Sequence, residues 1–199
     1  MNFRRITSLR VLLSASVFVA TASPLSAQAG AIGSVVHHIF RFVVSGGATL
    51  PAGELKDFHD TGFHADGAVL IKIPGIPFAL RPELSYTKLK FKNGVIPPTA
   101  LNGDASTKLL SGLGNIEIPL LMGLYVIGGA GAMNLKSDVG TTSDITQTKL
   151  LIDAGAGLRF HIKAIDGFVE ARVGSASYEK GKVGYSKAQF IPVTFGLVF

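Results

Sequence analysis

The sequence contains no cysteine and no tryptophan, and only 16% of its 199 residues are charged. The absence of cysteine excludes disulfide bonds, a thiol nucleophile, a lipid-anchored cysteine and every cysteine-ligated zinc or iron–sulfur site. Sustained 3.6-residue hydrophobic periodicity is also lacking, so a helical fold is not expected. What remains is a glycine-rich, apolar chain of single-domain length.

The first 29 residues have the pattern of a secretory signal peptide. A basic start precedes an apolar run over 11–22, and small residues then permit cleavage after Ala27 or Ala29. A membrane-anchoring helix is the alternative, but about a dozen apolar residues are fewer than the about 20 that cross a bilayer. The segment holds three basic residues and no acidic ones: Arg4, Arg5 and Arg10. We predict a signal peptide over 1–29 and one domain over 30–199.

Removal of this segment lowers the formal net charge from +6 to +3, because those three arginines are lost. The high isoelectric point therefore belongs largely to the leader. The excess of basic residues was the main indication of a nucleic-acid partner. Without it, no nucleic-acid partner is expected.

Apolar residues recur at every second position along most of the remaining chain, which is typical of strands with one apolar face. The stretch 116–133 could also be taken for a membrane helix, but Glu117, Pro119 and its glycines favour two strands joined by a turn near Pro119. The alternation predicts eight strands, at 39–50, 62–73, 78–91, 108–118, 121–135, 149–162, 167–177 and 187–199. An even number of strands permits a closed antiparallel barrel.

The predicted connections alternate in length. Four are longer and polar, at 51–61, 92–107, 136–148 and 178–186, and three are tight, at 74–77, 119–120 and 163–166. Long loops at one end and short turns at the other are typical of a transmembrane barrel.

Each predicted strand carries its charges on the face opposite the large apolar residues. That face holds five cations and five anions by parity: Arg41, Lys72, Arg81, Arg159, Arg172, Asp66, Glu83, Glu117, Asp153 and Glu170. Parity alone fits a soluble barrel with these charges in water as well as a membrane barrel with the charges inside. The signal peptide, the recurring apolar faces and the outward position of Phe199 favour lipid outside. The predicted fold class is an all-β, eight-stranded antiparallel up-and-down transmembrane β-barrel.

Several short motifs strengthen this prediction. The stretches SGGATLPAGELKDFHDTGF (45–63), GGAGAMNLK (128–136), AGAGLRF (154–160), GFVEARV (167–173) and the terminal FIPVTFGLVF resemble the small bacterial outer-membrane β-barrel domain family, akin to OmpA- and OmpX-type barrels. The resemblance implies an outer-membrane location with both termini periplasmic. It also implies that the C-terminal residues Val193, Phe195, Leu197 and Phe199 form an assembly signal for the barrel-assembly machinery. As the sequence stops at Phe199, no peptidoglycan-binding domain is expected to follow.

The inward charges are the strongest candidates for a functional site. Eight strands leave an interior just wide enough for side chains, so a paired polar plug is expected, with a gated ion or proton path as the alternative. A metal site from Asp57, His59, Asp60 and His64 is disfavoured by loose spacing, and no metal or cofactor is predicted. The sequence contains no GxSxG elbow and no His-x-Ser-Asn run, so it does not indicate a catalytic serine.

The sequence therefore predicts a non-enzymatic outer-membrane barrel with a structural or surface-display role. Its expected partners are outer-membrane lipid and, during insertion, the assembly machinery; the sequence does not identify a ligand of the long loops. Two alternatives remain open at this point. One is a soluble secreted barrel that binds a small apolar ligand, and the other is an outer-membrane lipid-modifying enzyme.

Overall fold

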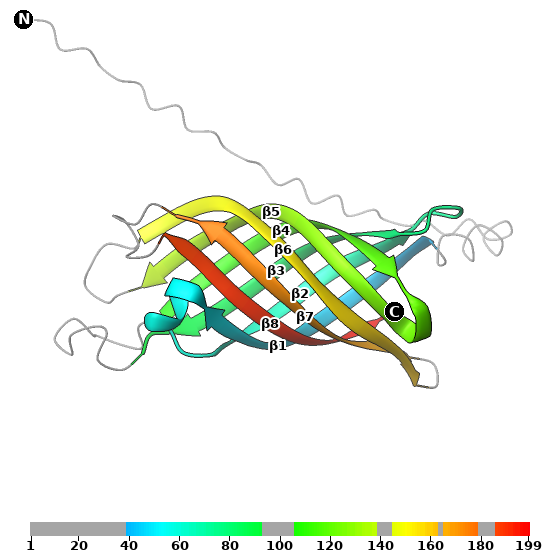
Figure 1. Cartoon of the computed structure of the whole chain (residues 1–199), viewed down its shortest axis with the longest axis horizontal. Coiled ribbons are helices and arrows are strands. Elements are labelled where there is room, and N and C mark those ends of the chain that lie inside the picture. The colour runs from blue at the N-terminus through cyan, green and yellow to red at the C-terminus, as the bar shows by residue number, and fades with distance from the viewer. Residues whose placement is uncertain (1–38, 93–105, 139–144, 163–164, 179–185) are drawn as a thin grey trace, which may run out of the picture.

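The computed structural model describes residues 39–92, 106–138, 145–162, 165–178 and 186–199, and shows a closed barrel (Figure 1). Every strand pairs antiparallel with its neighbours in the sequence, and β1 pairs with β8 to close the sheet. The strands are β1 (Phe40–Ala52), β2 (Gly62–Lys72), β3 (Ala79–Lys90), β4 (Ser106–Pro119), β5 (Leu124–Asp138), β6 (Ile145–Ile162), β7 (Ile165–Ser177) and β8 (Lys187–Val198). The predicted fold class is thereby confirmed. The predicted signal peptide over 1–29 lies outside the described residues.

The pairing register is continuous around the barrel. A path that starts at Phe40 and passes from each residue to its register partner on the next strand returns to β1 at Leu50 and not at Phe40. Strands that are staggered in this way tilt against the barrel axis, and at this strand number the lumen is filled by side chains.

The two ends of the barrel differ. A short 3-10 helix, η1 (Gly53–Asp57), follows β1 at one end, which we call the η1 end. The chain enters β1 and leaves β8 at the opposite end (Figure 1), where Phe42 and Phe199 exchange backbone hydrogen bonds of 3.2 and 2.9 Å. The short connections 73–78 and 120–123 also lie at this terminal end.

Two predicted connections differ most from the structure. The turn between β4 and β5 is not confined to 119–120, because residues Leu121–Gly123 form a second 3-10 turn, η3. Met122 and Gly123 both have positive φ, at 59° and 80°, and a Cβ on Gly123 would lie 2.5 Å from the carbonyl oxygen of Arg159. Apolar alternation carries no sign of such a turn, since its residues are themselves apolar.

The predicted loop 136–148 is also shorter than expected. Strand β5 continues to Asp138 and β6 begins at Ile145, four residues before the predicted start. Asn134 donates a 2.9 Å hydrogen bond to Thr148 across this hairpin. The polar residues of 136–148 predict a loop, but in the structure many of them extend the pairing of β5 and β6 beyond the apolar part of the barrel.

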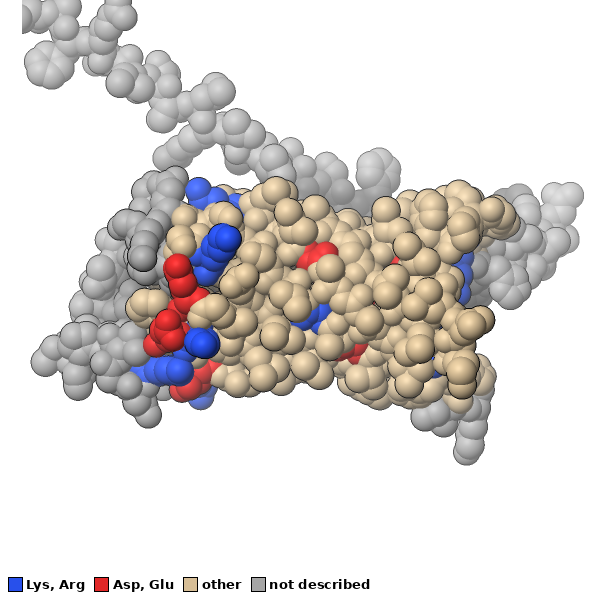
Figure 2. Space-filling model, viewed as in Figure 1, with Lys and Arg blue, Asp and Glu red and all other residues tan. Residues whose placement is uncertain are grey.

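The outward face of the barrel is apolar. Large exposed side chains occur on all eight strands, among them Phe42, Leu84, Leu110, Leu150, Val173 and Phe195. Figure 2 shows a broad surface between the two ends with few charged atoms, and Lys, Arg, Asp and Glu are gathered mainly at one end. Exposed apolar areas of this extent are rare on soluble monomers and indicate a surface that contacts lipid or another protein.

The lumen is divided into two regions. Near the η1 end it is filled by an apolar cluster that we call the apolar cap, formed by Leu55, Leu89, Leu109, Leu113, Met133, Leu135, Leu151, Ala176, Tyr178, Ala188 and Phe190. Towards the terminal end the lumen contains buried charges and a smaller apolar cluster of Val43, Leu70, Ala79, Tyr125, Ile127, Phe168 and Val198. The sequence did not predict the apolar cap, because parity assigned charged and small residues to the inward face.

Candidate functional site

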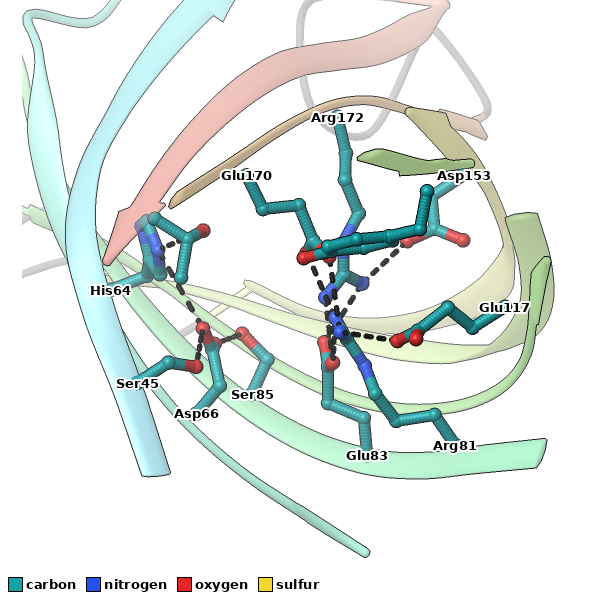
Figure 3. Close-up of polar contacts among 12 residues, drawn as sticks. Ser45, His64, Asp66, Arg81, Glu83, Ser85, Glu117, Asp153, Glu170 and Arg172 are labelled. Atoms are coloured by element: carbon teal, nitrogen blue, oxygen red, sulfur yellow. Dashed lines mark hydrogen bonds and ion pairs between the residues drawn. The ribbon is translucent and has the colours of Figure 1, made fainter. Parts of the chain in front are cut away.

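The buried charges come from strands on opposite sides of the barrel. Arg81 and Glu83 lie two residues apart on β3, and Glu170 and Arg172 lie two residues apart on β7. Residues two apart on a strand share a face, so each strand presents one cation and one anion to the lumen. Figure 3 shows the two pairs meeting across the lumen.

Arg81 is 1% exposed and lies at the centre of this group. Its guanidinium donates hydrogen bonds of 3.0 and 2.8 Å to the two carboxylate oxygens of Glu170, and a 3.1 Å bond to Glu83. The same group lies 5.6 Å from the ring centroid of Phe168. A two-point guanidinium–carboxylate contact is directional as well as strong, so it fixes both side chains.

Arg172 contacts three acidic residues. It donates bonds of 2.9 and 2.6 Å to the two carboxylate oxygens of Glu83, a 2.8 Å bond to Asp153 and a further bond to Glu170. Glu83 and Glu170 therefore each bridge Arg81 and Arg172. The two arginines have like charge, and these shared carboxylates compensate it.

A third arginine extends the group towards the terminal end. Arg159 forms contacts of 2.7 and 2.8 Å with Glu117, and its guanidinium lies 5.3 Å from the ring centroid of Tyr125. The Tyr125 hydroxyl donates a 2.7 Å hydrogen bond to Glu170. We call the connected set the charge network: Arg81, Glu83, Glu117, Tyr125, Asp153, Arg159, Glu170 and Arg172.

A buried network of this kind depends on complete pairing. Removal of an ion from water costs several kcal/mol, and only well-placed partners offset that cost. Loss of one partner therefore strands the others in the lumen.

The remaining predicted residues lie apart from the network. Asp66 accepts hydrogen bonds from Ser45 and Ser85 and lies 3.6 Å from His64, as Figure 3 shows. Arg41 pairs with Asp166 at the terminal mouth of the barrel, where both are about a quarter exposed. Parity gave the side of the sheet correctly for Arg41 and Asp66 but gave no information on their depth in the lumen.

The sequence predicts Lys72 as one of the inward charges, but Lys72 is not part of the charge network. It is exposed at the end of β2 and lines a cavity of about 230 Å³ at the terminal mouth, together with Glu117, Tyr125 and Arg159. Since it ends its strand, its side chain lies beyond the region where charges are enclosed.

Tyr125 and His64 were not among the predicted site residues. Tyr125 was missed because the glycines of β5 obscure the alternation there. A Cβ on Gly157 would lie 2.3 Å from the Tyr125 ring, so the inward glycine on β6 makes room for it. His64 falls within the predicted strand 62–73 and lies in the lumen between the hydroxyl groups of Thr49 and Thr194, at 2.9 Å from each.

The other histidine of the sequence hypothesis lies outside the strands. His59 is buried near the η1 end, 2.8 Å from the hydroxyl of the inward-facing Thr107, and its ring lies 4.4 Å from that of Phe91. Burial lowers the pKa of His59 to about 4. His59 and His64 thus have separate partners. Within the described ranges, no three His, Cys, Asp or Glu side chains come together as a metal site would require.

The C-terminal strand presents an apolar outward face. Val193, Phe195 and Phe199 are exposed, and Leu197 is partly exposed. Their role as an assembly signal stays a prediction. Among the described residues, no helix is long and apolar enough to span a bilayer.

A closed eight-stranded barrel with an apolar outer face and charges in its lumen has the fold of the small outer-membrane β-barrels. No protein-family model and no curated protein matches the sequence. Solved structures match the fold. Neisserial surface protein A is 14% identical with a TM-score of 0.53, covering 80% of this chain and 95% of that protein.

A second match comes from Yersinia pestis. The outer-membrane protein Ail in a phospholipid bilayer nanodisc is 14% identical, with a TM-score of 0.54, and the match covers 81% of this chain and 99% of Ail. Ail in complex with the heparin analogue sucrose octasulfate is 17% identical, with a TM-score of 0.51 and the same coverage. At these identities the similarity concerns the fold.

Proposed function

We propose that this chain is an integral protein of a bacterial outer membrane, with its apolar outer face against lipid and its lumen closed. The observation that carries the proposal is the inversion of the usual soluble arrangement: Arg81 is 1% exposed whereas Leu84, three residues later, is 69% exposed. In water this arrangement would be unfavourable for both residues. In a bilayer Leu84 contacts acyl chains, the carboxylates around Arg81 offset the cost of its burial, and closure of the sheet leaves no strand edge unpaired in hydrocarbon.

The same observation argues against a soluble barrel that binds an apolar ligand. Such a protein would need an apolar cavity inside and charges outside. Here the apolar cap is packed side chain against side chain, and the rest of the lumen holds the charge network and a smaller apolar cluster.

We further propose that the lumen is a plug and not a pore. The charge network and the apolar cap support this at two successive levels, since an ion would have to break several buried pairs and then cross packed leucines. The η1 helix adds Leu55 to the cap from outside the sheet.

The role that fits best is structural or surface display, without enzymatic activity. The η1 end would face the cell exterior and the terminal end the periplasm, as expected for export by a cleaved signal and insertion by the assembly machinery. Two proteins with the same fold are a surface protein and an attachment invasion locus protein, which supports a surface role. A lipid-modifying enzyme is distinguished by altered lipid A when the gene is deleted.

Fractionation of cells tests the location. The protein should be recovered with outer membranes, and the detergent-extracted, unboiled form should migrate differently from the boiled form in gel electrophoresis. Recovery as a soluble periplasmic monomer would refute the proposal.

Planar-bilayer recording tests the closed lumen separately. The reconstituted protein should give no large, stable conductance. A large stable current from the purified protein would contradict the plug while leaving membrane insertion intact.

A further inference from the structure

A cavity of about 230 Å³ lies at the terminal mouth of the barrel, and we call it the mouth cavity. The connection 73–78 lines one part of it with Ile76, and the turn between β4 and β5 lines another with Leu120. Lys72 and Arg159 add two cations to these apolar walls. The mouth cavity therefore combines apolar surface with positive charge.

Tight turns hold both apolar walls in place. The N–H of Ile76 donates a 3.2 Å hydrogen bond to the carbonyl oxygen of Ile73. A proline at the second position of this turn and a φ of 83° at Gly75, its third, are typical of a type II turn. On the other side, the N–H of Leu120 donates a 2.7 Å bond to the carbonyl oxygen of Leu124. The walls are thus formed before any ligand arrives, as in most small-molecule sites.

The cations that line the mouth cavity outnumber its anions. Glu117 is the acid among its lining residues, and it is already bound by Arg159 at 2.7 Å and by Arg81 at 3.5 Å. Lys72 forms no hydrogen bond or ion pair with a described residue. At longer range its ammonium group is attracted by Glu117 and repelled by Arg159 and Arg41. One positive charge in the cavity is therefore left without a partner of its own among the described residues.

No other acidic side chain of the terminal end supplies the missing charge. Asp166 is paired with Arg41 and His161. The stretches 1–38 and 163–164, which precede β1 and connect β6 with β7, contain no Asp or Glu. The connections from β3 to β4, from β5 to β6 and from β7 to β8 leave the barrel at the opposite end. A negative charge beside Lys72 is therefore expected from a ligand.

We propose that the mouth cavity binds a monocarboxylate with an apolar body of about eight carbons. The carboxylate lies against Lys72, where Arg159 adds to the positive potential, and the apolar body lies against Ile76 and Leu120. A cavity of about 150 Å³ holds benzene, so about 230 Å³ holds roughly nine or ten non-hydrogen atoms, the size of octanoate. The apolar walls disfavour an inorganic anion, and the unpaired cation disfavours a neutral ligand. The site goes beyond the proposed structural role and does not depend on the plug.

Calorimetric titration of the refolded full chain in nanodiscs tests the charged part of the site, with empty nanodiscs as the blank. Octanoate is compared with octanamide, which has the same length and no charge. Octanoate should bind at one saturable site, and octanamide about tenfold more weakly. Lys72→Gln should bind octanoate about tenfold more weakly than wild type and octanamide unchanged. Lys187→Gln, which removes the same charge at the η1 end, should retain wild-type affinity for both.

A matched pair of isoleucines tests the apolar part of the site. Ile76 and Ile73 belong to the same turn and are 39% and 42% exposed, but Ile76 lines the cavity and Ile73 does not. Ile76→Ala should weaken octanoate and octanamide alike, by about fivefold, because both lose the same apolar contact. Ile73→Ala should leave both affinities unchanged.

Chemical labelling places the ligand in the wild-type protein, without any variant. An amine-acetylating reagent is applied with and without saturating octanoate, and the extent of reaction at each lysine is read by mass spectrometry. Octanoate should slow the reaction of Lys72 and leave that of Lys187 unchanged.

Three results would overturn the proposal. Equal affinities for octanoate and octanamide would leave the cation without a role, and uptake no greater than that of empty nanodiscs would mean that the cavity holds no ligand of this class. Unchanged labelling of Lys72 at saturation would place octanoate elsewhere on the barrel. Each of these results leaves the membrane location intact, because cell fractionation tests it separately.

Discussion

The terminal half of the lumen is held by ions, whereas the half near η1 is held by packed apolar side chains. In the charge network each residue is fixed by named partners at hydrogen-bond distance, and Glu170 alone accepts from Arg81, Arg172 and Tyr125. In the apolar cap no single contact is directional, and Leu109, Met133 and Leu135 are buried by many neighbours. The network should therefore fail when one partner is lost, and the cap should weaken in proportion to the volume removed.

Loss of Glu170 should have the largest effect. Glu170→Ala leaves Glu83 as the one carboxylate that bridges Arg81 and Arg172, and we expect a loss of about 3–5 kcal/mol in the free energy of unfolding. Urea unfolding of the refolded barrel measures this loss. The folded fraction at each urea concentration is read from the difference in gel migration between unboiled and boiled protein. The double variant Arg81→Met/Glu170→Met removes the pair together and should be less destabilised than Glu170→Ala. Unchanged heat resistance of Glu170→Ala would contradict the pairing.

Truncation within the cap should have the next largest effect. Leu135→Ala removes a fully buried side chain, and we expect a loss of about 2–4 kcal/mol in the free energy of unfolding. The outward Leu110→Ala is the matched control, because lipid or detergent fills the space and the expected loss is smaller. A larger loss for Leu110→Ala than for Leu135→Ala would reverse the assignment of inside and outside.

Acid should weaken the η1 end through His59. Its pKa is lowered by burial to about 4, so the folded protein keeps this imidazole neutral at pH values where the unfolded chain protonates it. Stability from this residue is nearly complete above about pH 6.5 and falls as the pH decreases towards 4, by about 3 kcal/mol. His59→Gln should show a smaller decline over that interval. Identical pH profiles for the two proteins would refute a role for His59.

The terminal mouth should be the least sensitive region. Arg41 and Asp166 pair there at partial exposure, so Arg41→Gln should cost less than about 1 kcal/mol, and added salt should reduce the difference further. The same urea titration at low and high salt measures this. A loss as large as that of Glu170→Ala would mean that the mouth is part of the buried network.

The sequence predicted the strands and the side of the sheet on which each charge lies, because both depend on a two-residue period. It did not predict depth in the lumen. Arg41 and Arg81 have the same parity, yet one lies at the mouth and the other at the centre. The cap was missed for the same reason: Leu151 and Asp153 have the same parity, yet one belongs to the apolar cap and the other to the charge network.

The most direct test of the account compares two positions on β8. The chain has no tryptophan, so Phe195→Trp and Phe190→Trp each introduce a single fluorophore, at an outward and an inward position respectively. In vesicles of lipids with brominated acyl chains, fluorescence at position 195 should be strongly quenched and fluorescence at position 190 should be little affected. Quenching at 190 with protection at 195 would mean that the apolar cap faces lipid and that the barrel is inverted.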